Sequence, residues 1–353
     1  MKILILALSG IGDALIFTPA LKLLRKALPD AQIDALTMIK GAQDIYSRNP
    51  HINKVYFFEF LKEGKLNSLK YVFTLRGKYD ATISVYPSNR IEYNSINFLL
   101  GANKRAGINY LRKNFQNFGW LNNVTIKEDD SLHNAQTNIH LVEKLLGKNY
   151  NEEPAFEIFL NENDHAKADE HLKSLGIKND ETIIGFHPGT AVLKNHIKRR
   201  WEPEKFAELG KKLIEKHNAK IFIFGGPDED ELKENIRLRI NSPDVFSISK
   251  LNLPQSAALM KYCKAFVSND SSLMHVASAM QLKVAAIVGP TNPVYIHPWK
   301  TGHKIVSLNL ECAPCFIYSP RPLTCFRNDV KFKCIKELNV EMVYNAVTGL
   351  LAE

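Results

Sequence analysis

The chain has 353 residues, of which 45% are hydrophobic and 24% are charged, a composition typical of soluble globular proteins. Its length predicts two domains rather than a single hydrophobic core. No apolar run approaches the roughly 18 residues of a membrane span. Although the chain starts with an apolar stretch, Asp13 interrupts it and no small-residue cleavage site follows, so we expect a buried strand there and a cytoplasmic protein.

The net charge of +9 is concentrated in the first half of the chain. Thirteen Lys or Arg stand against five Asp or Glu between Lys40 and Lys113. Such an excess favours an acidic partner, which for this patch means anionic lipid headgroups, phosphorylated glycans or nucleic acid. A simple solvated surface is the alternative.

In chain order, short apolar runs alternate with segments of helical spacing. The run at residues 2–8 is typical of the buried centre of a parallel sheet, and after a turn at 9–13 we expect a helix that extends to Ala27. Further strands are predicted at 32–37, 55–60 and 81–85, with helices at 66–76 and 95–100. This alternation predicts a parallel sheet with helices on both faces.

A polar stretch at 148–163 predicts the connection between two domains, which we place at residues 1–160 and 161–353. The alternating pattern then restarts. We expect helices at 164–175, 203–217 and 256–262, and strands at 182–187, 220–224 and 245–248. The chain therefore predicts two α/β domains in series.

Residues 262–293 predict a strand, a polar turn, a helix, a strand and a second turn. The polar turn at 269–272 falls where the helix begins, and there unpaired backbone N–H groups and the helix dipole favour a phosphate or diphosphate. In an open α/β sheet, ligands bind beyond the carboxyl ends of the strands, where this turn would lie. The stretch therefore predicts a pocket for an anionic ligand.

Gly10 and Gly12 belong to the turn after the first strand. They suggest a dinucleotide-binding fingerprint, but Leu15 stands where its third glycine is needed, which argues against an NAD-dependent oxidoreductase. Asp13, just past this turn, is placed to accept a proton from a bound hydroxyl. An aspartate there also caps a helix well, and both interpretations stay open.

A loop at 187–190 (His-Pro-Gly-Thr) follows a predicted strand and precedes several basic residues. These are Lys194, Lys198, Arg199 and Arg200. Cationic side chains facing a helix N-terminus would stabilise a diphosphate leaving group, because negative charge develops on it as the bond breaks. The alternative is a solvated basic surface with Trp201 as a core anchor.

A second glycine turn, at 225–231 (GGPDEDE), follows another predicted strand. Glycines permit close backbone approach, and an acidic residue such as Glu229 can hold ribose hydroxyls. The alternative is that these acids are favourable charges in the first turn of a helix.

These motifs together resemble glycosyltransferase family 9, the ADP-heptose:lipopolysaccharide heptosyltransferases and their relatives. The resemblance rests on LSGIGDALIFTPAL, HPGT with RRWEPEKFAEL, IFGGPDEDE, NDSSLMHVASAM and VGPTNP. It implies the GT-B architecture, in which two Rossmann-like domains face each other across a cleft. The N-terminal domain would bind the acceptor and the C-terminal domain the nucleotide-sugar, with a last helix at about residues 340–351 returning toward the first domain.

The resemblance assigns roles to individual positions. Asp13, after Gly12, matches the family's proposed catalytic base, which deprotonates the acceptor hydroxyl in an inverting mechanism. Thr190 matches the polar residue near the phosphates. Arg199 stands where the family usually has lysine, which keeps the charge but changes the donor geometry. Glu229 matches a ribose ligand.

The resemblance also assigns roles to residues of the polar turn before the helix. Asp270, Ser271 and His275 fit the family's Asp-Ser/Thr-Gly…His motif around the diphosphate. Ser272 replaces the glycine of that motif, and its side chain would leave less room for the phosphates to come close to the backbone.

Four of the five cysteines cluster late in the chain as C-x2-C-x9-C-x8-C. They are Cys312, Cys315, Cys325 and Cys334. In a cytosolic protein this spacing favours thiolate ligands over disulfides, and four sulfurs suit structural zinc or iron. Some family members that modify bacterial autotransporters have a comparable iron-binding finger. Buried thiols beneath a loop are the alternative.

The sequence thus predicts an inverting glycosyltransferase that moves a heptose from ADP-heptose to a hydroxyl of a lipopolysaccharide core or related bacterial acceptor. No cofactor is required for this chemistry, and no nucleic-acid partner is expected. The basic first domain fits peripheral contact with the inner face of the cytoplasmic membrane. A UDP-sugar donor, a protein acceptor and a non-catalytic nucleotide-sugar-binding protein are the alternatives.

Overall fold

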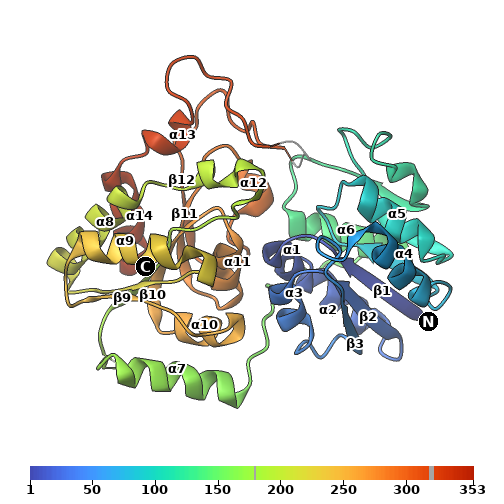
Figure 1. The fold of residues 1–353 in the computed structure, drawn as a ribbon, viewed down its shortest axis with the longest axis horizontal. Helices are drawn as coiled ribbons and strands as arrows, with labels where there is room; N and C mark the ends of the chain where they lie inside the picture. Colours follow the sequence, from blue (N-terminus) through green and yellow to red (C-terminus); the bar gives the residue numbers. More distant parts are fainter. Residues whose placement is uncertain (179, 318–321) are drawn as a thin grey trace. The chain divides into compact units, whose positions relative to one another are not determined.

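The computed structural model of the chain describes residues 1–178, 180–317 and 322–353 (Figure 1). The chain forms two compact units, Met1–Phe159 and Leu160–Glu353, each with its own parallel sheet. Within the described residues, no helix has both the length and the apolar character needed to cross a membrane.

The first unit alternates strands and helices along most of its length. Its elements are β1 (Lys2–Ala7), α1 (Ile11–Ile16), α2 (Thr18–Ala27), β2 (Gln32–Thr37), α3 (Lys40–Tyr46), β3 (Lys54–Phe57), α4 (Gly64–Leu75), β4 (Ala81–Ser84), α5 (Ile91–Leu99), β5 (Lys104–Asn109), the 3-10 turn η1 (Gly119–Leu121), β6 (Val124–Lys127) and α6 (Asn134–Leu146).

The six strands of the first unit are parallel and lie in the order β3-β2-β1-β4-β5-β6, which is the Rossmann order. On one face, Leu4 and Leu6 of β1 pack with Val72 and Leu75 of α4. Helices α1, α2, α3 and α6 contact one another in a second layer. Because the strand order reverses between β1 and β4, the loops that follow these two strands flank the position where ligands of such sheets bind.

The predicted first helix is two helices that meet at Phe17. Pro19 has no N–H to donate to the carbonyl of Leu15, and the Thr18 hydroxyl donates to that carbonyl instead at 2.7 Å. Strand β3 ends at Phe57, three residues before its predicted end, and strands β5 and β6 were not predicted.

The second unit begins with a helix and repeats the alternation. Its elements are α7 (Glu162–Ser174), β7 (Ile183–His187), the 3-10 segment η2 (Leu193–Arg199), α8 (Pro203–His217), β8 (Lys220–Ile223), η3 (Pro227–Glu229), α9 (Asp230–Ile240), β9 (Val245–Ser247), α10 (Leu253–Met260), β10 (Cys263–Asn269), α11 (Ser272–Ala279), β11 (Lys283–Ile287), α12 (Pro293–Ile296), β12 (His303–Val306), α13 (Lys333–Lys336) and α14 (Val340–Ala352).

The second sheet has the order β12-β11-β10-β7-β8-β9, which is again the Rossmann order counted from its own first strand. Its main core joins sheet residues such as Phe186 and Val267 to Phe206 of α8, Ile236 of α9 and Val347 of α14. Helix α14 packs on α8 and on strands β10, β11 and β12 of its own unit. The prediction that the last helix returns toward the first unit stays a prediction.

Two units of this kind confirm the α/β fold class that the sequence predicts. Which ligand each unit binds stays a prediction.

Candidate functional site

The candidate site of the second unit lies where β7 and β10 end. These strands are neighbours at the reversal of strand order, and their last residues are His187 and Asn269. The Asn269 amide donates to the carbonyl of Pro188 at 2.7 Å and its oxygen accepts from the Trp201 N–H at 3.0 Å. The end of β10 is thereby fixed to both ends of the basic loop.

An ion pair joins the basic loop to the turn before α11. The Arg199 guanidinium donates to the Asp270 carboxylate at 2.6 Å, and the exposed fractions of the two side chains are 11% and 9%. The Thr291 hydroxyl donates to the same carboxylate oxygen, also at 2.6 Å. Three segments of the chain therefore meet at one buried carboxylate.

Two buried nitrogens beside this ion pair make no hydrogen bond within the described residues. They are Nε of Arg199 and Nε2 of His196. Burial, together with the positive charge of Arg199, lowers the pKa of His196 to about 4, so the ring is neutral at pH 7. A buried polar group without a partner is costly, and a bound anion or its water would remove that cost.

Glu229 is the centre of a second network. Its carboxylate lies 3.1 Å from Nε2 of His187 and 3.6 Å from the guanidinium of Arg200, and it accepts from the Gly226 N–H at 3.1 Å. Burial raises the pKa of this carboxyl, but His187, Gly226 and Arg200 outweigh burial and hold it below its ordinary value. Glu229 is therefore ionised at neutral pH and holds the loop after β7 in place.

The glycine after Pro188 permits this approach. A Cβ at Gly189 would lie 1.7 Å from Oε1 of Glu229, and one at Gly225 would lie 2.7 Å from Oε2. A side chain at either position would displace the Glu229 carboxylate, which packs directly on the backbone of both turns.

The polar turn before α11 has the predicted strand-turn-helix form. The Ser271 hydroxyl bonds to Nδ1 of His187 at 2.7 Å rather than capping the helix, and Ser272 is the first helical residue. His275 lies one turn further on, where burial lowers its pKa to about 4. The N-terminus of α11 and Asp270 thus stand at the same edge of the sheet as the Glu229 network.

The remaining predicted residues of the basic loop take different positions. Thr190 is buried and its hydroxyl donates to the carbonyl of His196 at 3.0 Å. Lys194 has a left-handed backbone, with φ of 56°, and its carbonyl accepts from Leu323 at 2.9 Å. Lys198 is exposed. The loop brings Arg199 to Asp270, whereas Lys198 faces solvent.

In the first unit, Asp13 is the third residue of α1, and one of its carboxylate oxygens accepts from the Gly10 N–H at 2.8 Å. The sequence left open that Asp13 is the N-cap of this helix; the N-cap is Gly10, and Asp13 accepts from its N–H as the third helical residue. Gly12 lies within the same first turn of α1 and is partly exposed, as is Asp13.

Three tyrosines surround the charge of Asp13. Burial is the main cause that raises the pKa of Tyr46, Tyr93 and Tyr110, and the negative charge of Asp13 raises all three further. The Tyr46 hydroxyl donates to the carbonyl of Ala14 and the Tyr110 hydroxyl accepts from the Ser88 N–H. Asp13 therefore lies within electrostatic reach of tyrosines from α3, from α5 and from the position directly after β5.

The four late cysteines are electrostatic neighbours. Burial and then the other three thiols raise the pKa of Cys334 to about 11, and burial with Cys312 and Cys325 raises that of Cys315. The Phe332 N–H donates to Sγ of Cys325 at 3.2 Å. As arranged, however, no three metal-ligating side chains among the described residues are close enough together to hold an ion.

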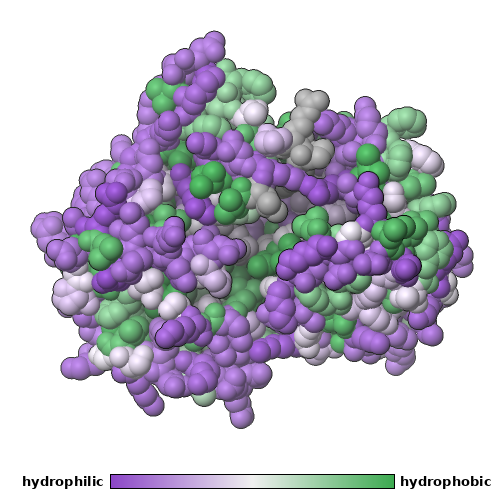
Figure 2. Space-filling model, in the orientation of Figure 1, coloured by the Kyte–Doolittle hydropathy of each residue, from purple (hydrophilic) through white to green (hydrophobic). Residues whose placement is uncertain are grey.

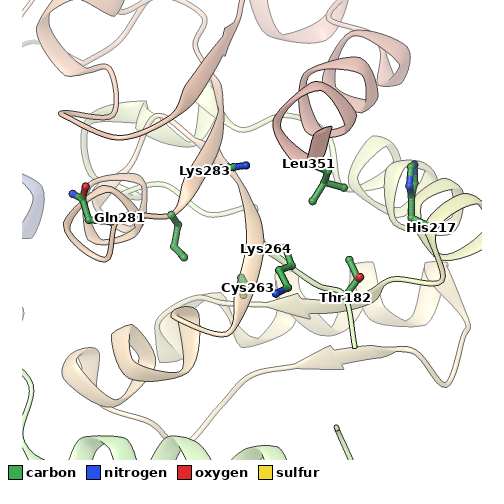
Figure 3. A pocket seen from close by; sticks show the side chains of 8 residues that line it. Thr182, His217, Cys263, Lys264, Gln281, Lys283 and Leu351 are labelled. Atoms are coloured by element: carbon green, nitrogen blue, oxygen red, sulfur yellow. The ribbon is translucent and has the colours of Figure 1, made fainter. Parts of the chain in front are cut away.

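A cavity of about 540 Å³ opens at the opposite edge of the second sheet, where β7, β10 and β11 begin (Figure 3). It is lined by Thr182, His217, Cys263, Lys264, Gln281, Leu282, Lys283 and Leu351. The Lys283 amine donates to the carbonyl of Leu350 at 3.0 Å, so it is directed at the end of α14. Ligands of such sheets bind beyond the carboxyl ends of the strands, so this cavity is distinct from the predicted site.

Two residues of the site were not among the predicted ligands. They are His187, which contacts Ser271 and Glu229, and Thr291, which donates to Asp270. A polar residue that ends an apolar strand, as His187 does after Ile183–Phe186, is the signal that identifies such a position.

The fold and the site together define the class. Two Rossmann-like units in series, each with its own six-stranded parallel sheet, have the GT-B architecture of glycosyltransferases. A model of glycosyltransferase family 9 (heptosyltransferase) matches residues 69–322, and the chain belongs to this family.

The names of similar proteins are consistent with membership of this family. The chain is similar to lipooligosaccharide heptosyltransferase 2 of Campylobacter jejuni, with 30% identity over 49% of this chain and 53% of that protein, so this match spans about half the length of its relative. It is 24% identical to lipopolysaccharide heptosyltransferase 2 of Escherichia coli over 87% of this chain and 88% of the relative.

A solved structure shows the same fold. The structure described as E. coli ADP-heptose lps heptosyltransferase II has a TM-score of 0.75 with 21% identity, and the match covers 100% of this chain and 99% of that one.

Proposed function

We propose that the protein transfers a heptose from ADP-heptose to a hydroxyl of a lipopolysaccharide core or related bacterial acceptor, with inversion at the anomeric carbon. The observation that carries this proposal is the buried Arg199–Asp270–Thr291 cluster at the N-terminus of α11. Family membership and the printed names of the relatives support heptose as the sugar and ADP as its carrier.

In the proposed reaction, the Asp13 carboxylate takes the proton of the acceptor hydroxyl. The acceptor oxygen then forms a bond to the anomeric carbon while the bond from that carbon to the diphosphate oxygen breaks. ADP leaves with the electron pair of that bond. The guanidinium of Arg199 and the N-terminus of α11 stabilise the charge that develops on the diphosphate.

The phosphate groups would lie against Nε of Arg199 and Nε2 of His196, the two buried nitrogens without hydrogen-bond partners in the described residues. Nε of Arg199 donates directly. The neutral His196 ring donates from Nε2 when Nδ1 carries no proton, which agrees with its contact of 3.3 Å to the Arg199 guanidinium. Two donors are then available to one anion.

A screen of nucleotide-sugars against truncated lipopolysaccharide cores, followed by mass spectrometry, tests the proposal. We expect the mass of one heptose to be added to a core acceptor with ADP-heptose. Addition from a UDP-sugar, or to a protein acceptor only, would replace the proposed donor or acceptor. Binding of ADP-heptose without transfer to any acceptor would show a non-catalytic binding protein.

We also propose that Cys312, Cys315, Cys325 and Cys334 hold a structural zinc or iron ion. Four cysteines that lie within electrostatic reach of Cys334, itself included, with a backbone N–H directed at the sulfur of Cys325, are a donor set suited to either metal. Binding would draw the sulfurs together and require all four to ionise.

Elemental analysis of the purified protein tests the metal. We expect about one equivalent of zinc or iron, lost in Cys325→Ser but retained in Cys263→Ser. Cys263 is the matched control because it is buried and stands apart from the cluster. Less than about a tenth of an equivalent in the wild-type protein would contradict the proposal.

A further inference from the structure

Exposed apolar side chains gather in one part of the first unit. Of the seventeen large apolar side chains that are exposed in the described chain, ten lie between residues 61 and 120. They are Leu61, Leu66, Leu69, Phe73, Ile91, Phe98, Leu111, Phe115, Phe118 and Trp120, and we call them the α4–α5 surface. Such a concentration is more than a solvated surface normally carries and indicates a contact with an apolar partner.

Helix α4 shows why this surface is unusual. Val72 and Leu75 are buried against the sheet, yet Leu66, Leu69 and Phe73 of the same helix are 76%, 42% and 49% exposed. A surface helix of a globular protein normally places polar residues on its outer side. Helix α4 is therefore apolar on both sides, and its outer apolar side chains are left exposed by the rest of the first unit.

Side-chain contacts join part of the α4–α5 surface, from Phe73 through Phe98 to the loop at Trp120. The Arg76 guanidinium lies over the ring of Phe73 and donates to the carbonyl of Leu99, which links the ends of α4 and α5. The Arg105 guanidinium in turn lies 5.5 Å from the ring of Phe98. Figure 1 shows α4 and α5 side by side, and Figure 2 shows apolar atoms over these helices on the face that it presents.

The same contacts reach the loop after β5. Arg105 also donates to the carbonyl of Leu121 at 2.9 Å, beside Trp120. The rings of Phe118 and Trp120 lie 5.9 Å apart in an edge arrangement. The aromatic residues of this loop therefore continue the surface that begins on α4.

Positive charge surrounds these apolar side chains. Residues 61–120 contain ten Lys or Arg against three Asp or Glu. Lys62, Lys65 and Lys70 are exposed on and before α4, and Arg112 and Lys113 stand beside Leu111 in the loop. Leu, Phe and Trp among lysines and arginines are typical of surfaces that enter the headgroup region of an anionic bilayer.

We propose that the α4–α5 surface docks the protein on an anionic phospholipid bilayer. The apolar side chains enter the boundary between headgroups and acyl chains, and the basic side chains contact the lipid phosphates. This inference deepens the proposed function, since it presents the first unit to an acceptor held in the same membrane. Vesicle binding is measured without donor or acceptor, so it is tested separately from sugar transfer.

Flotation with vesicles of phosphatidylglycerol and phosphatidylethanolamine tests the proposal. We expect the wild-type protein to float with them, to bind vesicles of phosphatidylcholine at least about tenfold more weakly, and to be released as salt rises from about 0.1 M to about 0.5 M. The double variant Leu66→Ser/Phe115→Ser should lose at least about tenfold in its partition coefficient.

The matched control is Leu238→Ser/Phe326→Ser, which also replaces one leucine and one phenylalanine. These side chains are 60% and 83% exposed in the second unit, far in sequence from the α4–α5 surface. The control should bind vesicles as the wild-type protein does. Equal binding of both double variants, or wild-type protein that stays unbound, would overturn the proposal.

Size-exclusion chromatography separates a bilayer from a second copy of the chain as the cover of this surface. We expect the wild-type protein and Leu66→Ser/Phe115→Ser to have the same oligomeric state. A change of that state in the double variant would overturn the proposal in favour of an interface between copies. Retained transfer to a delipidated acceptor would show that the variant is folded.

Discussion

The Arg199 guanidinium donates to the Asp270 carboxylate at 2.6 Å, and both side chains are almost entirely buried. A buried ion pair is stable only when further hydrogen bonds satisfy its partners, and Asp270 obtains one from Thr291. Nε of Arg199 obtains none within the described residues. The pair therefore positions a cation that keeps one donor for a ligand.

Replacing Arg199 with alanine should weaken ADP binding by about 10- to 100-fold, because a charge-assisted hydrogen bond contributes about 1.5–3 kcal/mol. Isothermal titration calorimetry measures this. Lys198→Ala is the neighbouring control, and it should change the affinity little because Lys198 is exposed and its charge is screened. Equal losses in both variants would show a general effect of charge rather than a directed contact.

Arg199→Lys separates charge from geometry at the same position. Lysine keeps the positive charge but lacks the planar fork that contacts Asp270 and a ligand together. We expect its affinity for ADP, by the same titration, to lie between those of the wild-type protein and Arg199→Ala. An affinity as low as that of the alanine variant would show that the guanidinium fork, and not the charge, binds the nucleotide.

Glu229→Gln should lower the free energy of unfolding by about 1–3 kcal/mol at pH 7, because His187 and Arg200 lose a charged partner. The pKa of Glu229 is held below the ordinary value of 4.5, so its contribution is present above that pH and is lost as the pH falls through the folded-state pKa. Urea unfolding at several pH values checks this.

The difference between the wild-type protein and Glu229→Gln should therefore shrink as the pH falls below about 4.5. Glu231→Gln is the control, since Glu231 is exposed two residues away. A difference that stays constant with pH would contradict ionisation of Glu229 as its cause.

Buried His275 makes the protein less stable in mild acid. Its pKa is lowered to about 4 from an ordinary 6.5, so the unfolded chain binds a proton between these values while the folded chain does not. Stability therefore falls as the pH drops below about 6.5, by about 2 kcal/mol between pH 7 and pH 5 for this one group. We expect His275→Asn to show a shallower decline in urea unfolding over that range, and an unchanged slope would contradict the assignment.

The sequence predicted elements best where local signals are complete. Residues 203–217 were predicted as a helix with the bounds that α8 has, because Pro203 starts it and apolar residues recur at helical spacing. Strands β5 and β6 were missed because KRAGIN and VTIK are short and carry charges at their ends. They are strands because they pair with neighbouring strands of the sheet, and the sequence does not show that pairing.

The sequence predicted which residues are candidates for the site, but it did not predict which of them contact one another. Arg199 and Asp270 were both candidate ligands, yet their ion pair joins positions 71 residues apart and depends on how β7 and β10 pair. Glu229 was predicted to bind ribose, and its contact with His187, which lies 42 residues away in the chain, was not predicted. Spacing along the chain does not predict such tertiary contacts.

Asp13→Asn separates the two roles of Asp13. The amide oxygen of asparagine can still accept from the Gly10 N–H that Asp13 binds at 2.8 Å, so the cap and the fold should persist. Asparagine takes up no proton at neutral pH. We therefore expect the turnover number to fall by about 100- to 10,000-fold, with ADP affinity by calorimetry and the unfolding midpoint nearly unchanged.

Asp13→Ala also removes the hydrogen bond to the Gly10 N–H, so it should lose about 1 kcal/mol of stability in addition to activity. Asp44→Asn is the control in the same unit, because Asp44 forms a surface ion pair with Lys40 and is expected to affect neither property much. Turnover by Asp13→Asn at the wild-type rate would assign Asp13 to helix capping alone. Lost turnover with an intact hydrogen bond to Gly10 would indicate that Asp13 acts in proton transfer, which asparagine cannot perform.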